Sequence, residues 1–425
     1  MTLFVFVGSL LGAMAIGVPV AFSLMFCGVV LMWYMGMFNT AIIAQNMISG
    51  ADTFTLLAIP FFILAGELMN SGGLSRRIID FAIALVGHIR GGLGIVAIVA
   101  AIIMASISGS AAADTAALAA ILIPMMAKAG YNIPRSGGLI AAGGIIAPVI
   151  PPSMAFIVFG VAANVSITQL FLAGIVPGIL MGISLIIAWL IVVRKDNIKP
   201  LPKTSGKERL VATVRAGWAL GMPVIILGGI KAGIMTPTEA AVVAAGYALF
   251  VGMVIYRELK PADLFHVLLR AAKSTSIIMF LVCAALVSAW LITAANIPNE
   301  VAGYIEPLID RPMLLMVAMM VLVFIVGTAL DLTPTILILT PVLMPIVKQA
   351  GIDPVYFGVL FIINNAIGLI TPPVGVVLNV VSGVGRIPLG KVTIGVWPFL
   401  VAETIVLALL VIFPDIVMVP LQYLR

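Results

Sequence analysis

The chain has 425 residues, of which 63% are hydrophobic and 9% are charged, and its net charge is +6. Soluble domains carry about 25% charged residues, so a chain this poor in charge cannot cover a water-facing surface, and most of its exterior must face lipid. The positive charges lie at the ends of apolar runs rather than on one compact basic face. This distribution argues against a nucleic-acid-binding protein and favours the positive-inside pattern of membrane proteins.

The first half of the chain predicts five membrane crossings. They lie at about 2–17, 19–36, 53–72, 136–164 and 168–193. No Lys or Arg precedes Arg76, so the apolar N-terminus lacks the positive region of a cleaved signal peptide and is expected to be a spanning helix. A further apolar stretch, 93–128, lies between the third and fourth crossings.

A polar, basic segment, 194–215, follows and divides the chain almost in half. The second half has crossings at about 216–233, 237–256, 266–295, 356–383 and 392–413, and another apolar stretch at 312–349. Punctuating residues recur in one register, so that the Pro-Pro pair at 151–152 returns 221 positions on at 372–373. We interpret 1–193 and 216–425 as two internal repeats joined by a cytoplasmic linker.

The number of crossings determines the orientation of the second repeat. Five crossings per repeat is an odd number, so the second repeat must run upside down in the membrane. With the linker in the cytoplasm, 18 of the 22 Lys and Arg residues fall on the inner side, in agreement with the positive-inside rule. Both termini are then predicted on the outer, periplasmic side.

The two extra apolar stretches, 93–128 and 312–349, are interrupted by small and polar residues at 106–110 and 327–334. Each limb has about 15 residues, or roughly 22 Å of helix, which is short of the roughly 30 Å hydrocarbon core. Each stretch is therefore predicted to be a re-entrant helical hairpin whose tip stops near the midplane.

The crossing that follows each hairpin is predicted to be a broken helix. Ala147–Ser153 in 136–164 and Gly368–Gly375 in 356–383 each contain adjacent prolines, which remove backbone donors and stop the helix. Freed carbonyls at membrane depth are tolerated only where they line a cavity or bind something. Two inverted repeats, each with a hairpin tip facing a broken helix, are typical of a midplane site for coupling ions and substrate.

The groups in these segments fit two sodium sites, because unwound backbone and side-chain oxygens are the ligands that such transporters use for Na⁺. The ligands predicted for the first site are Ser108, Gly109, Ser110, Asp114, Ala147, Ile150 and Ser153. Those predicted for the second site are Gly327, Thr328, Asp331, Gly368, Thr371 and the carbonyl of Val374. Helix N-termini that point into the same space favour an anionic substrate, for which Ser110, Ser153 and Asn365 are candidates.

Several of these assignments have a structural alternative. Asp114 and Asp331 are interpreted as ion ligands, because charge at membrane depth is costly and usually functional, or else as N-caps of the limb that follows. Asn365 either meets the substrate or bonds between helices. Glu403, deep in the last crossing, is expected to contact a partner subunit.

Enzyme chemistry is disfavoured by the residues at hand. The two histidines, His88 and His266, lie near the predicted inner surface, so no histidine at membrane depth can activate the serines of the first tip. The sequence has no H-E-x-x-H zinc motif and no G-x-x-x-x-G-K-[ST] nucleotide loop. The chain is predicted to be a solute transporter and not an enzyme, with no cofactor and with Na⁺ as coupling ion.

The tips and breaks also carry a family resemblance. The motifs Ile107–Asp114, Pro148–Ser153, Gly17–Phe22 and Leu369–Gly375 resemble those of the large membrane (M) subunit of tripartite ATP-independent periplasmic (TRAP) transporters, and the resemblance covers the whole chain. Together with the segments above, it implies an all-α polytopic membrane protein of about ten transmembrane helices plus two re-entrant hairpins. These would form two inverted-topology repeats of an elevator-type fold, as in the ion transporter superfamily.

The resemblance implies a sodium-driven importer of organic anions in the bacterial inner membrane, carrying C4-dicarboxylates, sialic acids or other sugar acids. It implies two partners, a small four-helix (Q type) membrane subunit and a periplasmic substrate-binding (P type) protein. The small subunit is expected as a separate polypeptide, because this chain starts directly at the large subunit. The hairpins and broken helices, about 93–164 and 312–383, would form the moving body. The alternative is a stand-alone sodium–carboxylate symporter or antiporter of related architecture.

Overall fold

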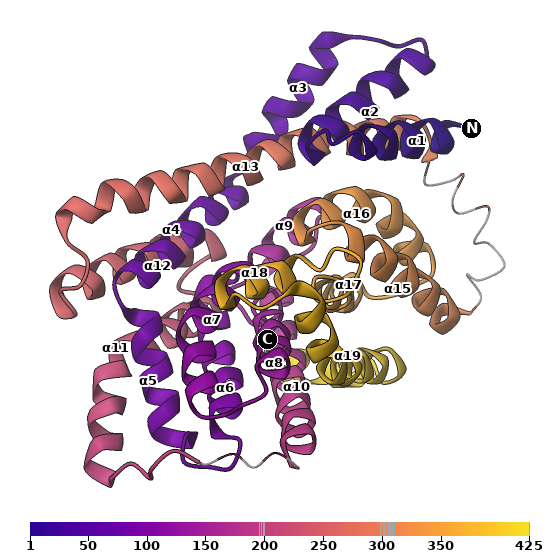
Figure 1. The fold of residues 1–425 in the computed structure, drawn as a ribbon. Coiled ribbons are helices and arrows are strands. Elements are labelled where there is room, and N and C mark those ends of the chain that lie inside the picture. Colours follow the sequence, from indigo (N-terminus) through magenta and orange to yellow (C-terminus); the bar gives the residue numbers. More distant parts are fainter. Residues whose placement is uncertain are drawn as a thin grey trace.

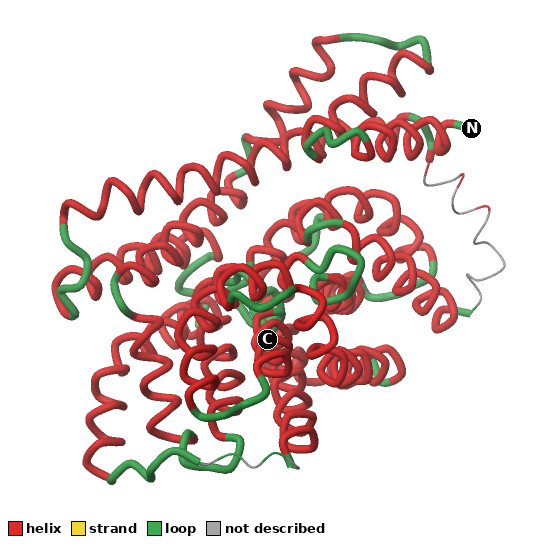
Figure 2. The backbone as a smooth tube through the Cα atoms, in the orientation of Figure 1, coloured by secondary structure: helices red, strands yellow, loops and turns green. Residues whose placement is uncertain are grey.

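The computed structural model describes residues 1–194, 196, 198, 200–297, 300, 303 and 311–424. Three of the basic residues counted above lie outside the described residues, namely Lys195, Lys199 and Arg425. The described part of the chain contains helices, turns and loops and no strand (Figure 2). The prediction of an all-α protein is therefore confirmed.

The helices follow one another closely along the chain. Those of the first half are α1 (Thr2–Ala15), α2 (Val20–Tyr34), α3 (Thr40–Ala51), η1 (Phe54–Leu57), α4 (Ala58–Ser71), α5 (Leu74–Val86), α6 (Gly92–Ser108), α7 (Ala111–Lys128), α8 (Ile133–Gly144), α9 (Met154–Ala163) and α10 (Ile167–Val193). Those of the second half are α11 (Gly206–Lys231), α12 (Pro237–Phe250), η2 (Val251–Ile255), α13 (Pro261–Ala294), α15 (Pro312–Ala329), α16 (Leu332–Gln349), α17 (Pro354–Gly368), α18 (Val376–Gly385), α19 (Leu389–Ile412) and α20 (Asp415–Leu424). Side-chain caps such as Ser166 on α10 and Asp353 on α17 satisfy backbone donors where helices begin.

Nine helices of the described chain are long and apolar enough to cross a membrane. Their free faces are apolar as well. On α10, Ile179, Ile183 and Ile187 follow each other one turn apart and are between 44% and 54% exposed, as expected of a stripe that faces lipid. A multi-pass membrane protein is thereby confirmed.

The order of helices shows the internal repeat. α7 and α16 both have 18 residues and begin 221 positions apart. The series α6 to α10, which is a helix pair, a helix broken at its centre and a long helix, recurs as α15 to α19. The boundaries of the two repeats and their orientation in the membrane stay predictions.

The helices form two groups (Figure 1). In the first, which we call the scaffold, α13 runs along one side of the molecule with α1, α2 and α3, while α4 packs along α12 and α11 packs on α12. In the second, which we call the body, both helix pairs α6–α7 and α15–α16 lie together with α8–α10 and α17–α20. The two groups meet where α5 packs between α11 and α6, and where α13 contacts α16.

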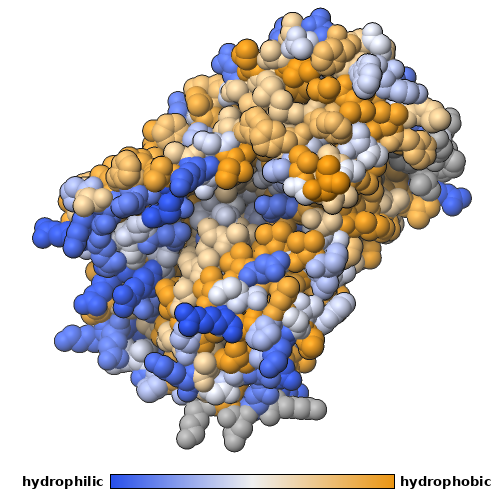
Figure 3. Space-filling model, turned by 45° about the horizontal axis from the view of Figure 1, so that its top comes forward, coloured by the Kyte–Doolittle hydropathy of each residue, from blue (hydrophilic) through white to orange (hydrophobic). Residues whose placement is uncertain are grey.

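Hydrophilic side chains gather along the left and lower edge of the molecule in Figure 3, and most of the remaining surface is apolar. Arg135 pairs with Asp196 at 3.3 Å, and Arg77 pairs with Glu258 at 2.7 Å. All four residues belong to segments that the charge distribution assigns to the cytoplasm. The orientation of these segments in the membrane stays a prediction.

Two helices of the first half are not predicted by the sequence. α3 begins after Asn39, whose side chain accepts a hydrogen bond from the backbone N–H of Ala41. α5 is amphipathic and buries one face while Arg76 and Asp80 stay on the other, so its mean hydropathy is too low for a predicted span.

The predicted length of the hairpin limbs was wrong. The limbs α6, α7, α15 and α16 have 17 or 18 residues, against a prediction of about 15. At roughly 26–27 Å the limbs are longer than predicted but still shorter than the roughly 30 Å hydrocarbon core. The feature that identifies these limbs as hairpins is the contact of each tip with the broken helix that follows it.

Candidate functional site

The tip of the first hairpin packs on the break of the crossing that follows it. α6 ends at Ser108 and α7 begins at Ala111, with Gly109 between them in the left-handed region at φ +60°. A Cβ at Gly109 would lie 2.7 Å from the carbonyl oxygen of Pro152, inside the break at 145–153. Glycine is required here both by the backbone conformation and by the close approach. The tip of this hairpin thus faces the broken helix, as the sequence predicts.

Polar side chains of the first tip form a buried network. The Ser108 hydroxyl donates to Oδ1 of Asp114 at 2.5 Å and accepts a hydrogen bond from the backbone N–H of Ser110 at 3.2 Å. Asp114 is 1% exposed, and its Oδ2 has no hydrogen-bond partner among the described residues. The cap of α7 is Ser110, whose Oγ accepts from the N–H of Ala113, so the alternative in which Asp114 is the cap is wrong. A buried, unsatisfied carboxylate oxygen remains at this junction.

The second hairpin meets its own broken helix in the same way. A Cβ at Gly368, the last residue of α17, would lie 2.6 Å from the carbonyl oxygen of Gly327 in α15. The side chain of Asn365 in α17 donates to the carbonyl of Leu332, the first residue of α16, at 3.2 Å. Asn365 is fully buried, and its Oδ1 has no hydrogen-bond partner in the described part of the chain. Each junction therefore holds at least one buried side-chain oxygen without a hydrogen-bond partner in the described part of the chain.

Asp331 occupies the tip of the second hairpin, between α15 and α16. Its side chain caps α16 by accepting the N–H of Leu332 at 2.8 Å, so the capping interpretation is confirmed for this residue. It also lines the cavity between the two tips. A carboxylate offers about four lone-pair sites, so the cap leaves acceptor capacity for an ion.

The remaining predicted ligands of the second site lie at the same junction. Thr328 and Thr371 each donate to a backbone carbonyl one turn back, at 2.8 Å. The carbonyl of Val374 accepts a hydrogen bond from the Asn379 side chain at 2.9 Å. A hydroxyl or carbonyl oxygen keeps a free lone pair in such a contact, so these bonds do not prevent binding of a cation.

Three predicted residues of the first site, Ala147, Ile150 and Ser153, lie within the first break and are buried. The Ser153 hydroxyl donates to the carbonyl of Pro148 and accepts from the N–H of Phe156, which makes it the cap of α9. Ser153 does not line the cavity between the tips. Its position gives it a structural role in the break rather than a direct path to substrate.

The tips of both hairpins line one cavity of about 130 Å³. Residues 109–112 contribute from the first hairpin, 331–333 from the second, and Ile278 from the scaffold helix α13. Of the three predicted substrate residues, Ser110 lines this cavity, whereas Ser153 and Asn365 do not. The structure thus brings the two halves of the chain together at one cavity.

A second cavity of about 190 Å³ adjoins the first one, and both are lined by Ser110 and Ile278. It extends along the scaffold helix α4, where Glu67 lines it. The carboxylate of Glu67 accepts a hydrogen bond from Nε of Arg270 in α13 at 2.8 Å. The cavity between the tips therefore continues into a second cavity between body and scaffold, and the Glu67–Arg270 ion pair lies at the side of this second cavity.

Comparison with known proteins agrees with this architecture. A family model described as "Tripartite ATP-independent periplasmic transporter, DctM component" matches residues 7–416. The chain belongs to this family. It is a large permease subunit of a TRAP transporter, and the predicted family is confirmed.

The permease is 54% identical over 425 residues to the 2,3-diketo-L-gulonate TRAP transporter large permease protein YiaN of Escherichia coli, with 100% of both chains covered. It is 42% identical over 405 residues to the sialic acid TRAP transporter large permease protein SiaM of Vibrio cholerae, with 95% of each chain covered. The crystal structure of the Alcanivorax borkumensis YdaH transporter has a TM-score of 0.61 and 15% identity, and the match covers 89% of this chain and 88% of that one. The last comparison shows a shared fold.

Sequence reasoning missed two features of the permease. One is the unsatisfied Oδ1 of Asn365 at the second junction. The repeat could have indicated this position, because the residue 221 positions earlier, Gly144, lies against the hydroxyl of Thr115 at the first junction. The interpretation of Glu403 as a partner contact was wrong. Glu403 is 0% exposed and is covered by helices of this chain.

Proposed function

We propose that this permease imports an organic anion together with Na⁺, by an elevator movement of the body against the scaffold. The observation that carries the proposal is the pair of junctions, each of which holds a buried oxygen without a hydrogen-bond partner in the described chain, on Asp114 and on Asn365. A bound cation satisfies such oxygens without any donor from the protein. Carbonyls freed in the two breaks supply further ligands of the kind that bind Na⁺ at broken helices.

Each of the two proposed sodium sites contains one carboxylate. At the first, Asp114 brings a carboxylate beside Ser108 and Ser110, with carbonyls of Gly109 and of the break around Ala147 and Ile150 nearby. At the second, Oδ1 of Asn365 joins Asp331, Thr371 and the carbonyls of Gly327 and Gly368. Asn365 thereby becomes an ion ligand in place of the substrate ligand that the sequence predicts.

The substrate site is proposed in the cavity between the tips. Ser110 caps α7 and Asp331 caps α16 at this cavity, so two helix N-termini, which carry partial positive charge, point toward it. Such a site favours an anion. The relatives are named for 2,3-diketo-L-gulonate and for sialic acid, and we propose a sugar acid of this kind, in preference to a C4-dicarboxylate, as the substrate here.

Family membership supports the proposed partners, and the charge distribution supports the proposed orientation. We propose that a small Q-type membrane subunit and a periplasmic P-type binding protein act with this permease in the bacterial inner membrane, with both termini periplasmic. Family membership favours this tripartite system over a stand-alone sodium–carboxylate symporter. Two Na⁺ entering with a monoanion carry one net positive charge, worth about 2.3 kcal/mol per 100 mV of membrane potential.

Uptake in proteoliposomes tests the proposal. The vesicles contain both membrane subunits, and the loaded binding protein is added outside. A Na⁺ gradient should drive uptake without ATP, and an inside-negative potential should accelerate it. Equal uptake with choline in place of Na⁺ refutes the coupling, and uptake without the binding protein favours the stand-alone alternative.

A further inference from the structure

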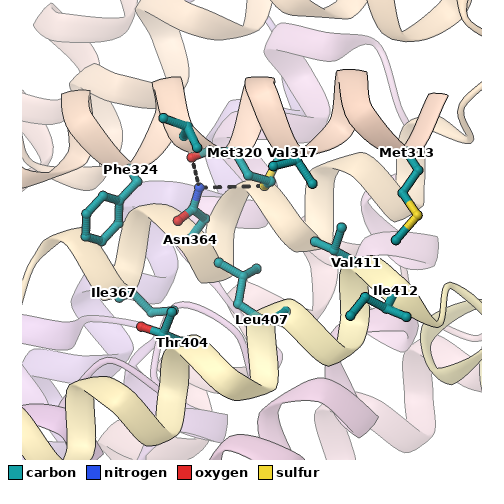
Figure 4. Close-up of a pocket in the computed structure, with 12 residues that line it drawn as sticks. Met313, Val317, Met320, Phe324, Asn364, Ile367, Thr404, Leu407, Val411 and Ile412 are labelled. Carbon is teal, nitrogen blue, oxygen red and sulfur yellow. Dashed lines mark hydrogen bonds between the residues drawn. The ribbon is translucent and has the colours of Figure 1, made fainter. Parts of the chain in front are cut away.

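A large groove lies on the face of the body formed by α15, α17 and α19, and at Ile367 it borders Gly368 of the second junction (Figure 4). Its volume is about 440 Å³, and ten of its twelve lining residues are apolar. The two polar ones both donate to backbone carbonyls of the protein. Asn364 donates to the carbonyl of Met320 at 2.5 Å, and Thr404 donates to that of Leu400 at 2.8 Å. The groove therefore suits an apolar ligand that makes no hydrogen bonds.

The groove is continued by a neighbouring cavity of about 340 Å³, which shares three lining residues with it, Met313, Val411 and Ile412. This second part reaches Pro312 and Asp353, the residues from which α15 and α17 begin. Along α17 the two parts extend from residue 353 to residue 367, or roughly 21 Å of helix. This length suits a chain that enters from one membrane surface and reaches toward the middle of a core about 30 Å thick.

The mouth of the groove carries opposite charges. Arg311 is exposed and directly precedes Pro312, which lines the second part, and Asp353, which also lines that part, is exposed at the start of α17. A phosphate diester pairs with the guanidinium of an arginine, and a primary ammonium pairs with a carboxylate. A zwitterionic aminophospholipid carries both of these groups on one headgroup, directly above its acyl chains.

We infer that the groove is a binding site for one aminophospholipid, with an acyl chain between α15, α17 and α19 and the headgroup at Arg311 and Asp353. A helix of a partner protein fits less well, because one helical turn, about 10–12 Å across and about 5.4 Å long, displaces roughly 400–600 Å³ and would fill the wider part alone. A partner fixed to this face would also have to travel with the body; this step alone rests on the proposed elevator movement. A lipid moves with the body at no such cost.

Native mass spectrometry of the permease, purified with any membrane subunit that accompanies it, tests the site without a transport assay. Phosphatidylethanolamine and phosphatidylglycerol are offered in equal amounts after delipidation. The wild type should retain one phosphatidylethanolamine, and Ala408→Trp, which fills the groove, should lower the bound fraction at least fivefold. The matched control is Ile405→Trp on the same helix, where Ile405 is 54% exposed and does not line the groove; it should bind as the wild type does.

Arg311→Gln should lower retention about threefold and reduce the preference for phosphatidylethanolamine over phosphatidylglycerol. Equal retention in Ala408→Trp and wild type overturns the site, and equal retention of both lipids by the wild type overturns the headgroup assignment. A photoreactive benzoylphenylalanine at Val321, which lines the groove and is 53% exposed, provides a second measurement in cells. An adduct of phospholipid mass supports the inference, whereas an adduct with the small subunit, or with no lipid at all, overturns it.

Discussion

A Cβ built on Gly109 would lie 2.7 Å from the carbonyl oxygen of Pro152, so the first hairpin tip and the first break touch backbone to backbone. This contact closes one side of the space between the tips. It also holds the network of Ser108 and Asp114 against the unwound carbonyls of the break. The proposed sodium site depends on this approach, which gives a direct way to perturb it.

Gly109→Ala should abolish or strongly reduce transport and lower the free energy of unfolding by about 1–3 kcal/mol, because it adds a steric clash to a left-handed backbone. Gly130→Ala is the matched control, since Gly130 has φ +80° but a Cβ added there would meet no atom within 4 Å. Transport and thermal melting are measured for both variants. Both substitutions strain a left-handed backbone, but only Gly109→Ala adds the steric clash, so a difference between them reports the clash. Equal losses in both variants would show that the contact with Pro152 does not matter.

Removal of single ligands should change sodium dependence more than stability. The variants are Ser110→Ala, Asp114→Ala, Asp331→Ala and Thr371→Ala. Each should raise the Na⁺ concentration for half-maximal uptake at least tenfold, which corresponds to about 1.4 kcal/mol of lost binding. Loss of a helix cap alone costs about 1 kcal/mol of stability. Variants that melt early but keep the wild-type Na⁺ dependence would reduce these residues to structural caps.

Arg270 should help to attract the anion, because its partner Glu67 lines the cavity between body and scaffold. Arg270→Ala should raise the half-saturating substrate concentration about three- to tenfold, or about 0.7–1.4 kcal/mol. Arg77→Ala is the control. Arg77 forms an ion pair of similar length with Glu258 but does not line that cavity. Substrate kinetics that change equally in both variants would assign Arg270 a purely structural role.

The orientation of the chain can be measured across a single helix. Cysteines replacing Lys203 and Lys231, at the two ends of α11, should react from opposite sides of sealed cells in a background without Cys27 and Cys283. The residue at 203 should be protected from an impermeant reagent and that at 231 should react. Labelling of 203 from outside would invert the predicted topology.

The fold was largely predictable because the spanning helices of a membrane protein are long apolar runs that are visible in the sequence. Apolar runs, Pro-Pro breaks at 151–152 and 372–373, and basic ends reveal the crossings and the repeat. Helices that do not span are harder to predict. α5 has one polar face, and α3 follows a short turn after α2, so neither stands out in hydropathy.

The site was predictable in part. The tips and breaks follow from composition, but the atoms that remain unsatisfied depend on which capping contacts form. From the sequence, Asp114 is a candidate cap of α7, but the structure uses Ser110, and Oδ2 of Asp114 is unpaired within the described chain. The unpaired oxygen of Asn365 likewise arises from packing against Gly327 across two helices, which no local pattern reveals.

The central claim is that the two tip–break junctions bind Na⁺. Thermal melting of the purified permease across a Na⁺ series, with K⁺ and choline series at equal ionic strength, measures this directly. A ligand that binds only the folded state stabilises it by about 2.7 kcal/mol at one hundred times its dissociation constant. Na⁺ alone should raise the melting temperature of the wild type, and the double variant Asp114→Ala/Asn365→Ala should lose this rise. An equal rise with all three cations, or a rise retained by the double variant, would contradict the account.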